Sequence, residues 1–345
     1  WAWSFVCLFW ATQSPLGHSF EPSDVNLDLH RDPISEKLTQ QSISQSFQDS
    51  RGAVWFVSQE GINKYTGHEL ENYRYSPSAP NSLPTNLVTQ ITESSAGKIW
   101  LSTLGGGLAF YDSTSNDFTA FYSDPNDHNT PYSNDIHAIY SDREGFLWLG
   151  YTNGFSKFDP TTLSFHHFVS GNSDIPFMGE VSGFTQSEDG AIWVASEATG
   201  VLRIDPITNQ IAPYGQMPLD EKRLTSGRLY RMITDSTGHI WVASEKSGVM
   251  RINPISRQIR NFVHSGEDTR SLSSDQTSDV FEDSNGDIWI ATAEGLNLFA
   301  ADTEDFVRFG THNTDLPDDS IISIYQTREG KYWVGTRSGL ASGMR

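Results

Sequence analysis

The amino-acid sequence predicts an all-β fold, a seven-bladed β-propeller whose blades are four-stranded antiparallel sheets. The first observation is a Gly-x-x-Trp motif that recurs every 44 to 48 residues. Its tryptophans are Trp55, Trp100, Trp148, Trp193, Trp241, Trp289 and Trp333. The second observation is another glycine six or seven residues later, at Gly61, Gly107, Gly154, Gly200, Gly248, Gly295 and Gly339. A period of this length with strand-like content is typical of one propeller blade per repeat.

Each repeat contains the same succession of short strands. The first strand opens twelve residues before the tryptophan, at Ile43, Val88, Ile136, Val181, Leu229, Thr277 and Ile321. Its apolar residues alternate as in a half-buried strand. It ends in a turn that reads Asp-x-x-Gly at Asp49, Asp142, Asp235 and Asp283, where the short acidic side chain can hydrogen-bond the turn's own backbone. The tryptophan lies on the second strand, a third follows the second glycine, and paired apolar residues such as Phe118 and Phe121 indicate a fourth.

The tryptophan is expected to pack between neighbouring blades and not to contact a ligand. The residue two positions later, on the same strand face, is small in six of the seven repeats: Val57, Ser102, Gly150, Ala195, Ala243, Ala291 and Gly335. A large indole beside a small neighbour suits packing between adjacent sheets.

The last repeat stops soon after its third strand, so another segment must complete the seventh blade. Residues 25–30, Val-Asn-Leu-Asp-Leu-His, alternate like a strand and belong to no repeat. We predict that they supply the missing outer strand, because this pairing would remove two exposed sheet edges.

Length and charge limit the class of protein. The ring of seven blades uses residues 21–345 as one domain. The formal net charge is −20, from 23 basic and 43 acidic residues. Such a surface repels nucleic acid and anionic lipid, so neither is expected as a partner. Helical periodicity is lacking, and helix content should be close to nil.

Residues 1–20 differ from the rest of the sequence. They open with an uncharged apolar run of 11 residues, about the length of a signal-peptide core and too short to span a bilayer. The run contains the only cysteine, Cys7, and the sequence does not begin with methionine. We interpret residues 1–20 as a signal-peptide remnant and predict a periplasmic protein; a frayed chain end is the alternative.

These residues resemble the two-component regulator propeller repeat. Residues 136–159 read Ile-His-Ala-Ile-Tyr-Ser-Asp-Arg-Glu-Gly-Phe-Leu-Trp-Leu-Gly-Tyr-Thr-Asn-Gly-Phe-Ser-Lys-Phe-Asp, which follows that repeat nearly throughout. The linkers 76–86 and 123–134 are similar to the family's Asp-Pro-Asn-x-x-Ser-Leu linker. The resemblance covers about residues 25–345.

The resemblance implies the periplasmic sensor of a membrane-bound signalling protein, whose output domain is a histidine kinase or a diguanylate cyclase. Many family members carry fourteen repeats as two propellers, an immunoglobulin-like domain and a transmembrane helix. This chain has seven repeats and none of those further parts, so we expect a fragment of a longer sensor, with a free-standing propeller as the alternative. The implied partners are a small-molecule ligand, such as an oligosaccharide, a downstream signalling domain and a second copy of the chain.

No catalytic, metal or cofactor site is expected in this chain. Ser187 to Trp193 resembles a sialidase Asp-box, but the arginine triad that sialidase catalysis needs does not recur. Asp283 to Asp287 resembles the front of a calcium loop, yet the sixth position is Ile288, where the loop needs glycine. His166 and His167 are adjacent on a strand, so their rings point to opposite faces and cannot chelate one ion.

Two other functions remain open. A lyase of the virginiamycin-inactivating type has Gly-x-x-Trp-Phe repeats and uses a histidine, acidic residues and magnesium near its central channel. Only Trp55-Phe56 matches that form here, and no histidine recurs at a rim position. A non-catalytic interaction scaffold is the third interpretation.

The turns between second and third strands are the variable part of the repeat and should gather on one rim, where binding is expected. Glu197, Glu245 and Glu294 occupy comparable places in three of these turns, Arg337 follows in the next, and Glu60 and Asn153 lie in two others. Carboxylates and a guanidinium near a shared axis could hydrogen-bond a polyhydroxylated or cationic molecule. A solvated acidic rim is the alternative.

Overall fold

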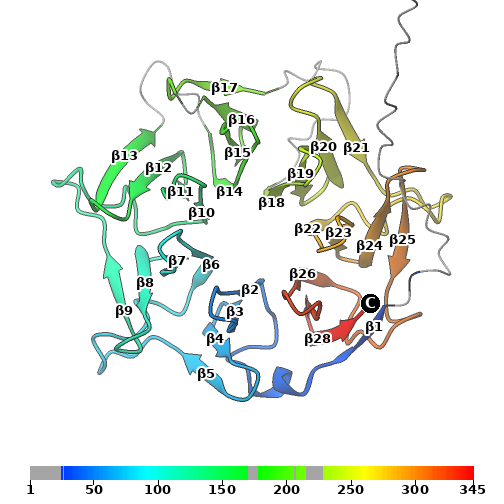
Figure 1. Ribbon diagram of the computed structural model, residues 1–345, viewed down its shortest axis with the longest axis horizontal. Helices are drawn as coiled ribbons and strands as arrows, with labels where there is room; N and C mark the ends of the chain where they lie inside the picture. The colour runs from blue at the N-terminus through cyan, green and yellow to red at the C-terminus, as the bar shows by residue number, and fades with distance from the viewer. Residues whose placement is uncertain (1–24, 26, 170–177, 206, 215–227) are drawn as a thin grey trace, which may run out of the picture.

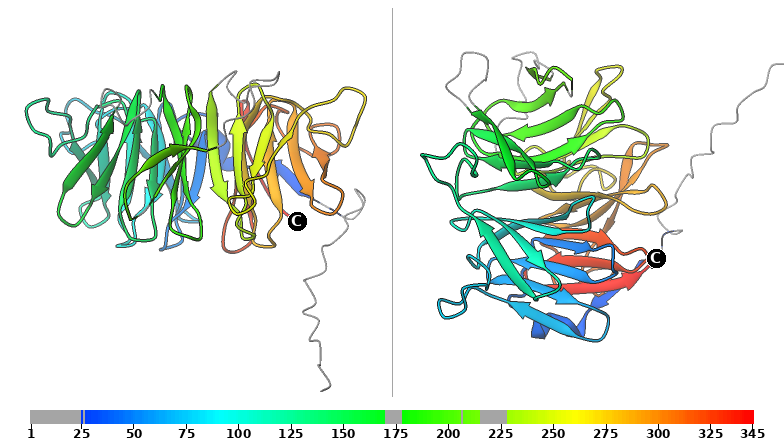
Figure 2. Two further views of the ribbon diagram at one scale, coloured as in Figure 1. Left: turned by 90° about the horizontal axis from the view of Figure 1, so that it is seen from above. Right: turned by 60° about the vertical axis from the view of Figure 1, so that its left-hand side comes forward.

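The structure is a computed structural model that describes residues 25, 27–169, 178–205, 207–214 and 228–345. Seven four-stranded antiparallel sheets surround a central channel (Figure 1). Seen edge-on, the ring is a flat disc with two rims (Figure 2). The predicted fold class is therefore confirmed. The predicted signal-peptide remnant, residues 1–20, lies outside the described residues.

Each blade is a meander whose first strand lies nearest the channel. The first three blades are formed by β2 (Gln45–Gln48), β3 (Val54–Ser58), β4 (Gly61–Tyr65) and β5 (Leu70–Tyr73); β6 (Val88–Glu93), β7 (Ile99–Thr103), β8 (Leu108–Asp112) and β9 (Asp117–Phe121); and β10 (Ala138–Ser141), β11 (Leu147–Tyr151), β12 (Gly154–Asp159) and β13 (Ser164–Val169). Blades 4 to 6 are formed by β14 (Val181–Gln186), β15 (Ile192–Ser196), β16 (Gly200–Ile204) and β17 (Ile211–Pro213); β18 (Leu229–Thr234), β19 (Ile240–Ser244), β20 (Val249–Ile252) and β21 (Ile259–Phe262); and β22 (Thr277–Glu282), β23 (Ile288–Thr292), β24 (Gly295–Ala300) and β25 (Asp305–Phe309).

Blade 7 joins the two ends of the chain. It contains β26 (Ile321–Gln326), β27 (Tyr332–Thr336), β28 (Gly339–Met344) and, as its outer strand, β1 (Asp28–Arg31). β1 pairs antiparallel with β28, from Asp28 opposite Met344 to Arg31 opposite Ala341. The predicted closure by an N-terminal strand is confirmed, although the strand begins at Asp28 and not at residue 25.

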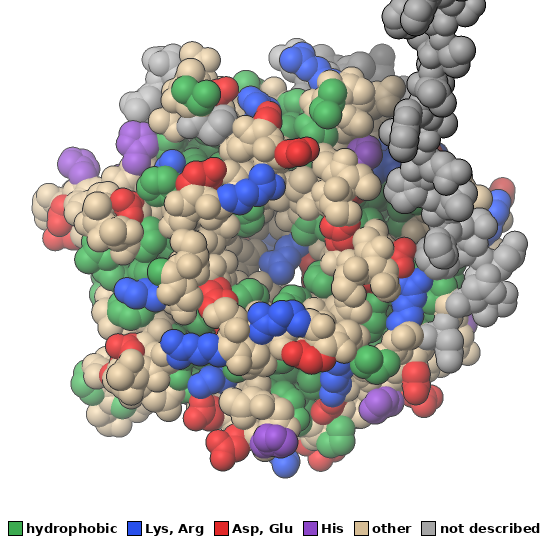
Figure 3. Space-filling model, in the orientation of Figure 1, with side chains coloured by type: hydrophobic (Ala, Val, Ile, Leu, Met, Phe, Trp, Pro, Cys, Tyr) green, Lys and Arg blue, Asp and Glu red, His purple; other side chains and the backbone are tan. Residues whose placement is uncertain are grey.

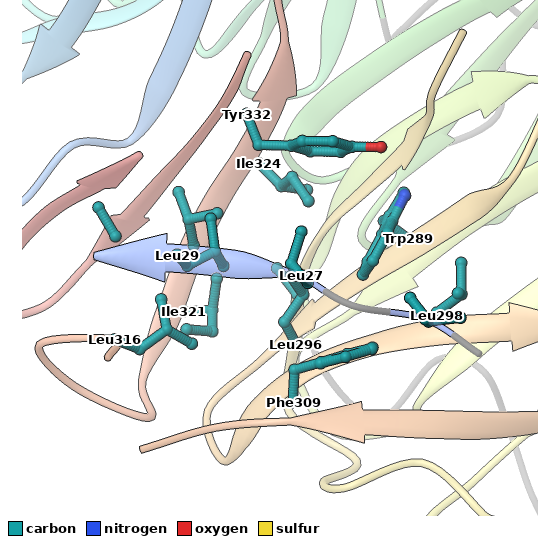
Figure 4. Packing of buried hydrophobic residues seen from close by; sticks show 14 residues of the cluster. Leu27, Leu29, Trp289, Leu296, Leu298, Phe309, Leu316, Ile321, Ile324 and Tyr332 are labelled. Atoms are coloured by element: carbon teal, nitrogen blue, oxygen red, sulfur yellow. The ribbon is translucent and has the colours of Figure 1, made fainter. Parts of the chain in front are cut away.

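The residues just before β1 are buried without pairing. Val25 and Leu27 belong to one apolar cluster with Leu29 and with Trp289 of blade 6. Figure 4 shows Leu27 between Trp289 and Leu29, where blades 6 and 7 meet. The N-terminal segment therefore completes one blade and also covers the junction with its neighbour.

Asp32 fixes this segment to blade 7. Its Oδ2 accepts hydrogen bonds from Lys331 Nζ at 3.1 Å and Ser342 Oγ at 2.6 Å, and its Oδ1 accepts one from the Ile34 backbone at 3.0 Å. Burial by itself would raise the pKa of Asp32, but the hydrogen bonds from Ser342, Ile34 and Lys331 outweigh it and lower the pKa. Asp32 also caps the short 3-10 helix η2 (Pro33–Lys37), the one helix among the described residues. Within those residues no helix is long and apolar enough to cross a membrane.

The repeated tryptophans pack between blades, as predicted. Trp55 lies 5.0 Å from the ring of Tyr111 in blade 2, and Trp333 of blade 7 lies 5.0 Å from the ring of Phe56 in blade 1. Trp193 clusters with Leu229 and Met232 of blade 5. Because each indole is buried against the following blade, the seven contacts close the ring.

The Asp-x-x-Gly turn also holds the indole in place, which the sequence did not predict. The Oδ2 of each aspartate accepts a hydrogen bond from Nε1 of its tryptophan at 2.7 to 2.9 Å in the pairs Asp49–Trp55, Asp142–Trp148, Asp235–Trp241 and Asp283–Trp289. The Oδ1 accepts from the turn's backbone, as predicted; at Asp235 the donors are Thr237 N and His239 N. Ser187 Oγ replaces the carboxylate for Trp193 at 2.8 Å.

Candidate functional site

At one rim the channel widens into a cavity of about 540 Å³, which we call the channel mouth. Its wall is formed by the first residues of the inner strands, by the segments that lead into them, and by turns between second and third strands. The channel mouth lies on the rim on which the sequence placed binding. Figure 3 views the ring from the other rim, that of the Asp-x-x-Gly turns, and shows the channel there as a central hollow with basic and acidic side chains beside it.

Several polar side chains of the channel wall are used to join blades. The position ten residues before the tryptophan holds Gln45, Gln90 and Asp279 in blades 1, 2 and 6. Each accepts a hydrogen bond from the backbone of the following blade: Gln45 Oε1 from Ile91 N at 2.9 Å, Gln90 Oε1 from Ile139 N at 3.0 Å, and Asp279 Oδ2 from Ile324 N at 3.1 Å. These oxygens belong to the frame and are not free for a ligand.

Asp279 differs from the two glutamines because it also pairs with a cation. Its Oδ1 lies 3.3 Å from Arg231 Nε of blade 5, and the carboxylate side chain is only 7% exposed. Burial raises the pKa of Asp279, although Arg231 and the backbone donors Ile324 and Val280 oppose the shift. The pair places one charged contact across the junction of blades 5 and 6.

A second charged group spans blades 3, 4 and 5. Glu180 Oε2 lies 2.7 Å from Arg228 Nη2 and 3.6 Å from His137 Nδ1. The Glu180 side chain is 12% exposed, whereas that of Arg228 is 49% exposed. His137 Nε2 lies 3.2 Å from Thr152 Oγ1. Glu180 thus accepts a hydrogen bond from Arg228 and lies beside the ring of His137, so it contacts side chains of two other blades at the edge of the cavity.

Two of the six predicted site residues line the channel mouth. Glu245 faces the cavity, and its Oε2 accepts a hydrogen bond from Arg228 N at 3.2 Å. Arg337 also lines it and is exposed, and its backbone N donates to Ser320 O at 3.0 Å. The turns of blades 5 and 7 therefore lie where the sequence placed them.

The other four predicted residues lie in the expected turns but outside the cavity lining. Glu60, Glu197 and Glu294 are exposed. Glu197 Oε2 accepts from Glu180 N at 3.4 Å, so it supports the segment that carries Glu180. Asn153 has a φ of 66°, and its buried Oδ1 has no hydrogen-bond partner in the described part of the chain.

The sequence missed His137, Glu180, Arg228, Arg231 and Asp279. All five lie on inner strands or on the segments leading into them. The available signal was irregularity within a fixed column: thirteen residues before the tryptophan stand Ser42, Leu87, Asp135, Glu180, Arg228, Gln276 and Ser320, of which only three are charged. Histidine was dismissed because none recurs, yet a binding residue has no reason to recur in every blade.

The motifs set aside in the sequence are structural. Asp283 accepts from Trp289 Nε1 at 2.9 Å and from Asn285 N at 2.9 Å within its turn. His167 Nδ1 lies 2.7 Å from Ser156 Oγ and its Nε2 lies 3.0 Å from His128 O, at the outer edge of blade 3. Among the described residues no group of three His, Cys, Asp or Glu is placed to hold a metal ion.

Comparison with solved structures identifies the fold. The extracellular domain of a protein described as a hybrid two component system of B. thetaiotaomicron matches 92% of this chain with a TM-score of 0.77 and 23% sequence identity. A second such domain from the same organism matches 92% with a TM-score of 0.71 and 18% identity. The chain spans only 42% and 39% of the lengths of these two structures. Virginiamycin B lyase from Staphylococcus aureus matches 92% of this chain and 98% of its own, with a TM-score of 0.67 and 13% identity.

The sequence itself carries the family signal. No curated protein matches the chain. The model of the two component regulator propeller matches residues 133–153, 271–294 and 315–338, which lie at the channel-side parts of blades 3, 6 and 7. The chain is therefore a seven-bladed propeller in which three of the seven repeats match the model of the two component regulator propeller.

Proposed function

We propose that this chain is the extracytoplasmic ligand-sensing propeller of a membrane-bound signal-transduction protein, and that it binds a small molecule at the channel mouth. The observation that carries the proposal is the cavity of about 540 Å³ whose edge holds His137, Glu180 and Arg228 from three different blades. Small-molecule sites are usually concavities of roughly 300–1,000 Å³ with a few convergent polar groups. The matching repeats and the similar extracellular domains support the signalling role and the periplasmic location.

The polar groups of the mouth favour a polyhydroxylated ligand over a cationic one. Three guanidinium groups line the cavity, those of Arg228, Arg231 and Arg337. Of its three carboxylates, those of Glu180 and Asp279 already have cationic partners, and that of Glu245 accepts from the backbone of Arg228. A cation would therefore meet mostly compensated charge. A sugar offers hydroxyl groups that both donate and accept, so it can hydrogen-bond guanidinium and carboxylate groups without disrupting the existing pairs.

Occupancy of the mouth would be transmitted through blade junctions. Glu180 of blade 4 contacts residues of blades 3 and 5, so a ligand that draws Arg228 away from Glu180 changes a contact between two blades. A downstream signalling domain and a second copy of the chain are the partners that we propose to read this change.

Calorimetry against a panel of neutral oligosaccharides tests the proposal. For a panel member that binds the parent chain, Glu180→Gln and Arg337→Gln should each weaken binding about tenfold, which corresponds to about 1.4 kcal/mol. Glu294→Gln is the matched control, because it removes a carboxylate from the same rim outside the cavity. Equal binding by the parent and both mouth variants would refute the site, and a chain that binds no panel member would favour a scaffold for a protein partner.

One observation favours a lyase as a second candidate. His137 and Glu180 lie 3.6 Å apart at the cavity, which is the kind of pair that general acid–base chemistry uses, and a similar solved structure is a catalytically inactive virginiamycin B lyase with quinupristin. Incubation of this chain with quinupristin and magnesium, followed by chromatography, separates the candidates. Turnover that His137→Ala abolishes would establish the enzyme, and unchanged substrate supports the sensor.

A further inference from the structure

A second cavity, of about 610 Å³, lies between blades 1 and 2 at the opposite rim, among the Asp-x-x-Gly turns. We call it the blade 1–2 cleft. Arg51 reaches it from the turn of blade 1 and Lys98 from the turn of blade 2, while Lys64 on β4 and Thr114 after β8 form other parts of its wall. It shares no lining residue with the channel mouth.

The acidic groups at this cleft are used by the frame. Asp49 accepts from Trp55 Nε1, as its counterparts do in other blades. Glu93 accepts from Ser50 N at 2.7 Å, and Glu282 makes the same contact with Ser236 N at the junction of blades 5 and 6. Asp112 accepts from Thr114 N at 2.8 Å within its turn. These carboxylates are therefore structural and are already hydrogen-bonded.

Of the three basic side chains at the cleft, two lack hydrogen-bond and ion-pair partners within the described residues, and the third is paired. Arg51 and Lys98 are exposed, and neither side chain makes an ion pair or hydrogen bond within the described residues; Lys98 Nζ lies 5.3 Å from the ring centre of Phe110. Lys64 Nζ contacts Glu71 at 3.3 Å and Tyr111 Oη at 3.2 Å. Burial alone would lower the pKa of Lys64, but contacts with Tyr111 and Glu71 outweigh it and raise the pKa, so Lys64 remains a cation.

The positions of Arg51 and Lys98 can be compared with the equivalent positions at the other blade junctions. Arg51 stands four residues before its tryptophan and Lys98 two residues before the next one. At the other six junctions the same two positions hold Ala96 and Phe146, Glu144 and Ala191, Asp189 and His239, Thr237 and Asp287, Asn285 and Lys331, and Glu329 and Ala53. Both positions are held by Lys or Arg only at the junction of blades 1 and 2.

We propose that the blade 1–2 cleft binds a small multivalent oxyanion, a polycarboxylate or a phosphorylated molecule. The planar guanidinium of Arg51 can donate two parallel hydrogen bonds to a carboxylate or phosphate. Lys98 supplies a second charge from the other side of the cleft, and the hydroxyl groups of Thr66 and Thr114 can complete the contacts. The two cations can contact the anion together, and neither has an ion pair within the described residues that binding would break.

The test is calorimetry of the whole chain at low ionic strength with citrate and, separately, inorganic phosphate, using acetate as the monovalent control. Saturable binding of at least one multivalent probe is expected. Arg51→Gln and Lys98→Gln should each weaken it about tenfold, and Arg51→Lys should restore only part, because it keeps the charge without the bidentate geometry. Whichever of citrate and phosphate binds more tightly identifies the class of anion.

Lys246→Gln is the matched control, because it removes one exposed positive charge from a turn outside both cavities. Its affinity should equal that of the parent. Glu180→Gln should also leave citrate or phosphate binding unchanged, so failure of the channel-mouth proposal and failure of this one are distinguishable. Absence of saturable binding by both probes, or an equal loss in Lys246→Gln, would overturn the proposal. Thermal melting should show little change for Arg51→Gln or Lys98→Gln, since neither side chain makes a hydrogen bond or ion pair within the described residues and Lys98 would lose only its contact with the Phe110 ring.

Discussion

The two rims of the propeller use the same kinds of charged residue for different purposes. On the rim of the Asp-x-x-Gly turns, Asp49, Asp142, Asp235 and Asp283 repeat, and each hydrogen-bonds its own turn and its own tryptophan. At the channel mouth, Glu180 and Asp279 occur once each and pair with arginines of a neighbouring blade. A carboxylate that recurs at one position of several blades serves the frame, whereas a charged side chain that appears once at its position, such as Glu180, is a candidate for binding.

The same criterion separates residues on a single rim. At the blade 1–2 cleft the carboxylates of Asp49 and Glu93 make contacts that recur elsewhere in the ring, while Arg51 and Lys98 have no basic counterparts together at another junction. The other blades of a repeat protein therefore serve as an internal control, because residues that recur at equivalent positions are those that folding of a blade requires.

Removal of the closing strand should have the largest effect. Deletion of residues 21–33 removes β1, Asp32 and the Leu27–Leu29 packing, and leaves β28 and the blade 6–7 junction exposed. We expect a large fall in melting temperature and aggregation in size-exclusion chromatography, because an open strand edge and an apolar surface meet water together. Deletion of residues 1–20 is the control and should leave both unchanged. A normal melting curve for the longer deletion would contradict the closure.

Truncation of one repeated tryptophan should cause the second-largest loss of stability. Trp241→Ala removes a fully buried indole that packs 5.0 Å from the ring of Phe299 in the following blade. The expected loss is about 3–5 kcal/mol of unfolding free energy, measured by denaturant titration. Lys246→Gln, on the same blade but on the exposed turn, should change stability little. If Trp241→Ala instead weakened ligand binding without lowering stability, the interpretation of the tryptophans as structural would be wrong.

Loss of the turn aspartate should lower stability less than loss of the tryptophan. The contribution of this residue can be tested both by removing the aspartate from one blade and by introducing it into another. Asp235→Ala leaves the buried Nε1 of Trp241 without its acceptor and should cost about 1–3 kcal/mol. In blade 2 the equivalent position is Ser94, and neither Ser94 Oγ nor Trp100 Nε1 has a hydrogen-bond partner within the described residues. Ser94→Asp should therefore raise the melting temperature. A decrease would show that blade 2 cannot adopt the geometry of its neighbours.

Acid should weaken the closure through Asp32. Because hydrogen bonds lower its folded-state pKa, its ionised form stabilises the fold above the unfolded-state value of about 3.9, and this stabilisation is lost as pH falls through the folded-state pKa. Asp32→Asn should have a lower melting temperature than the parent at pH 7, and the difference should shrink below about pH 4. A difference that stays constant with pH would exclude the carboxylate as its cause.

The charged group at the channel mouth should contribute least to stability. Glu180→Gln breaks its contacts with His137 and with Arg228, whose side chain is about half exposed, so the unfolding free energy should change by about 1 kcal/mol or less. Denaturant titration of this variant beside Trp241→Ala sharpens the comparison of the two rims. A loss as large as that of the tryptophan variant would place Glu180 in the frame and remove it from the candidate site.

The ring of seven blades, the order of strands within each blade, the packing of the tryptophans between blades and the closing segment could all be predicted from the amino-acid sequence. These features are predictable because each repeat must bury the same apolar face against its neighbour. The same pattern of apolar residues therefore recurs in all seven repeats. Even so, the sequence placed the closing strand three residues early, since Val25 and Leu27 alternate like a strand but are buried at a blade junction without pairing.

Which polar residues share a cavity follows from the three-dimensional fold. Of the residues that the sequence predicted for the site, Glu245 and Arg337 line the channel mouth, whereas Glu60, Glu197, Glu294 and Asn153 lie outside its lining. Glu180, Arg228 and Asp279 line it but were not predicted. The physical reason is that the channel brings together residues from the inner strands of all blades, far apart in the chain, with a direction and depth that periodicity does not encode. The indole–carboxylate contacts of the Asp turns likewise depend on a three-dimensional distance that spacing alone does not specify.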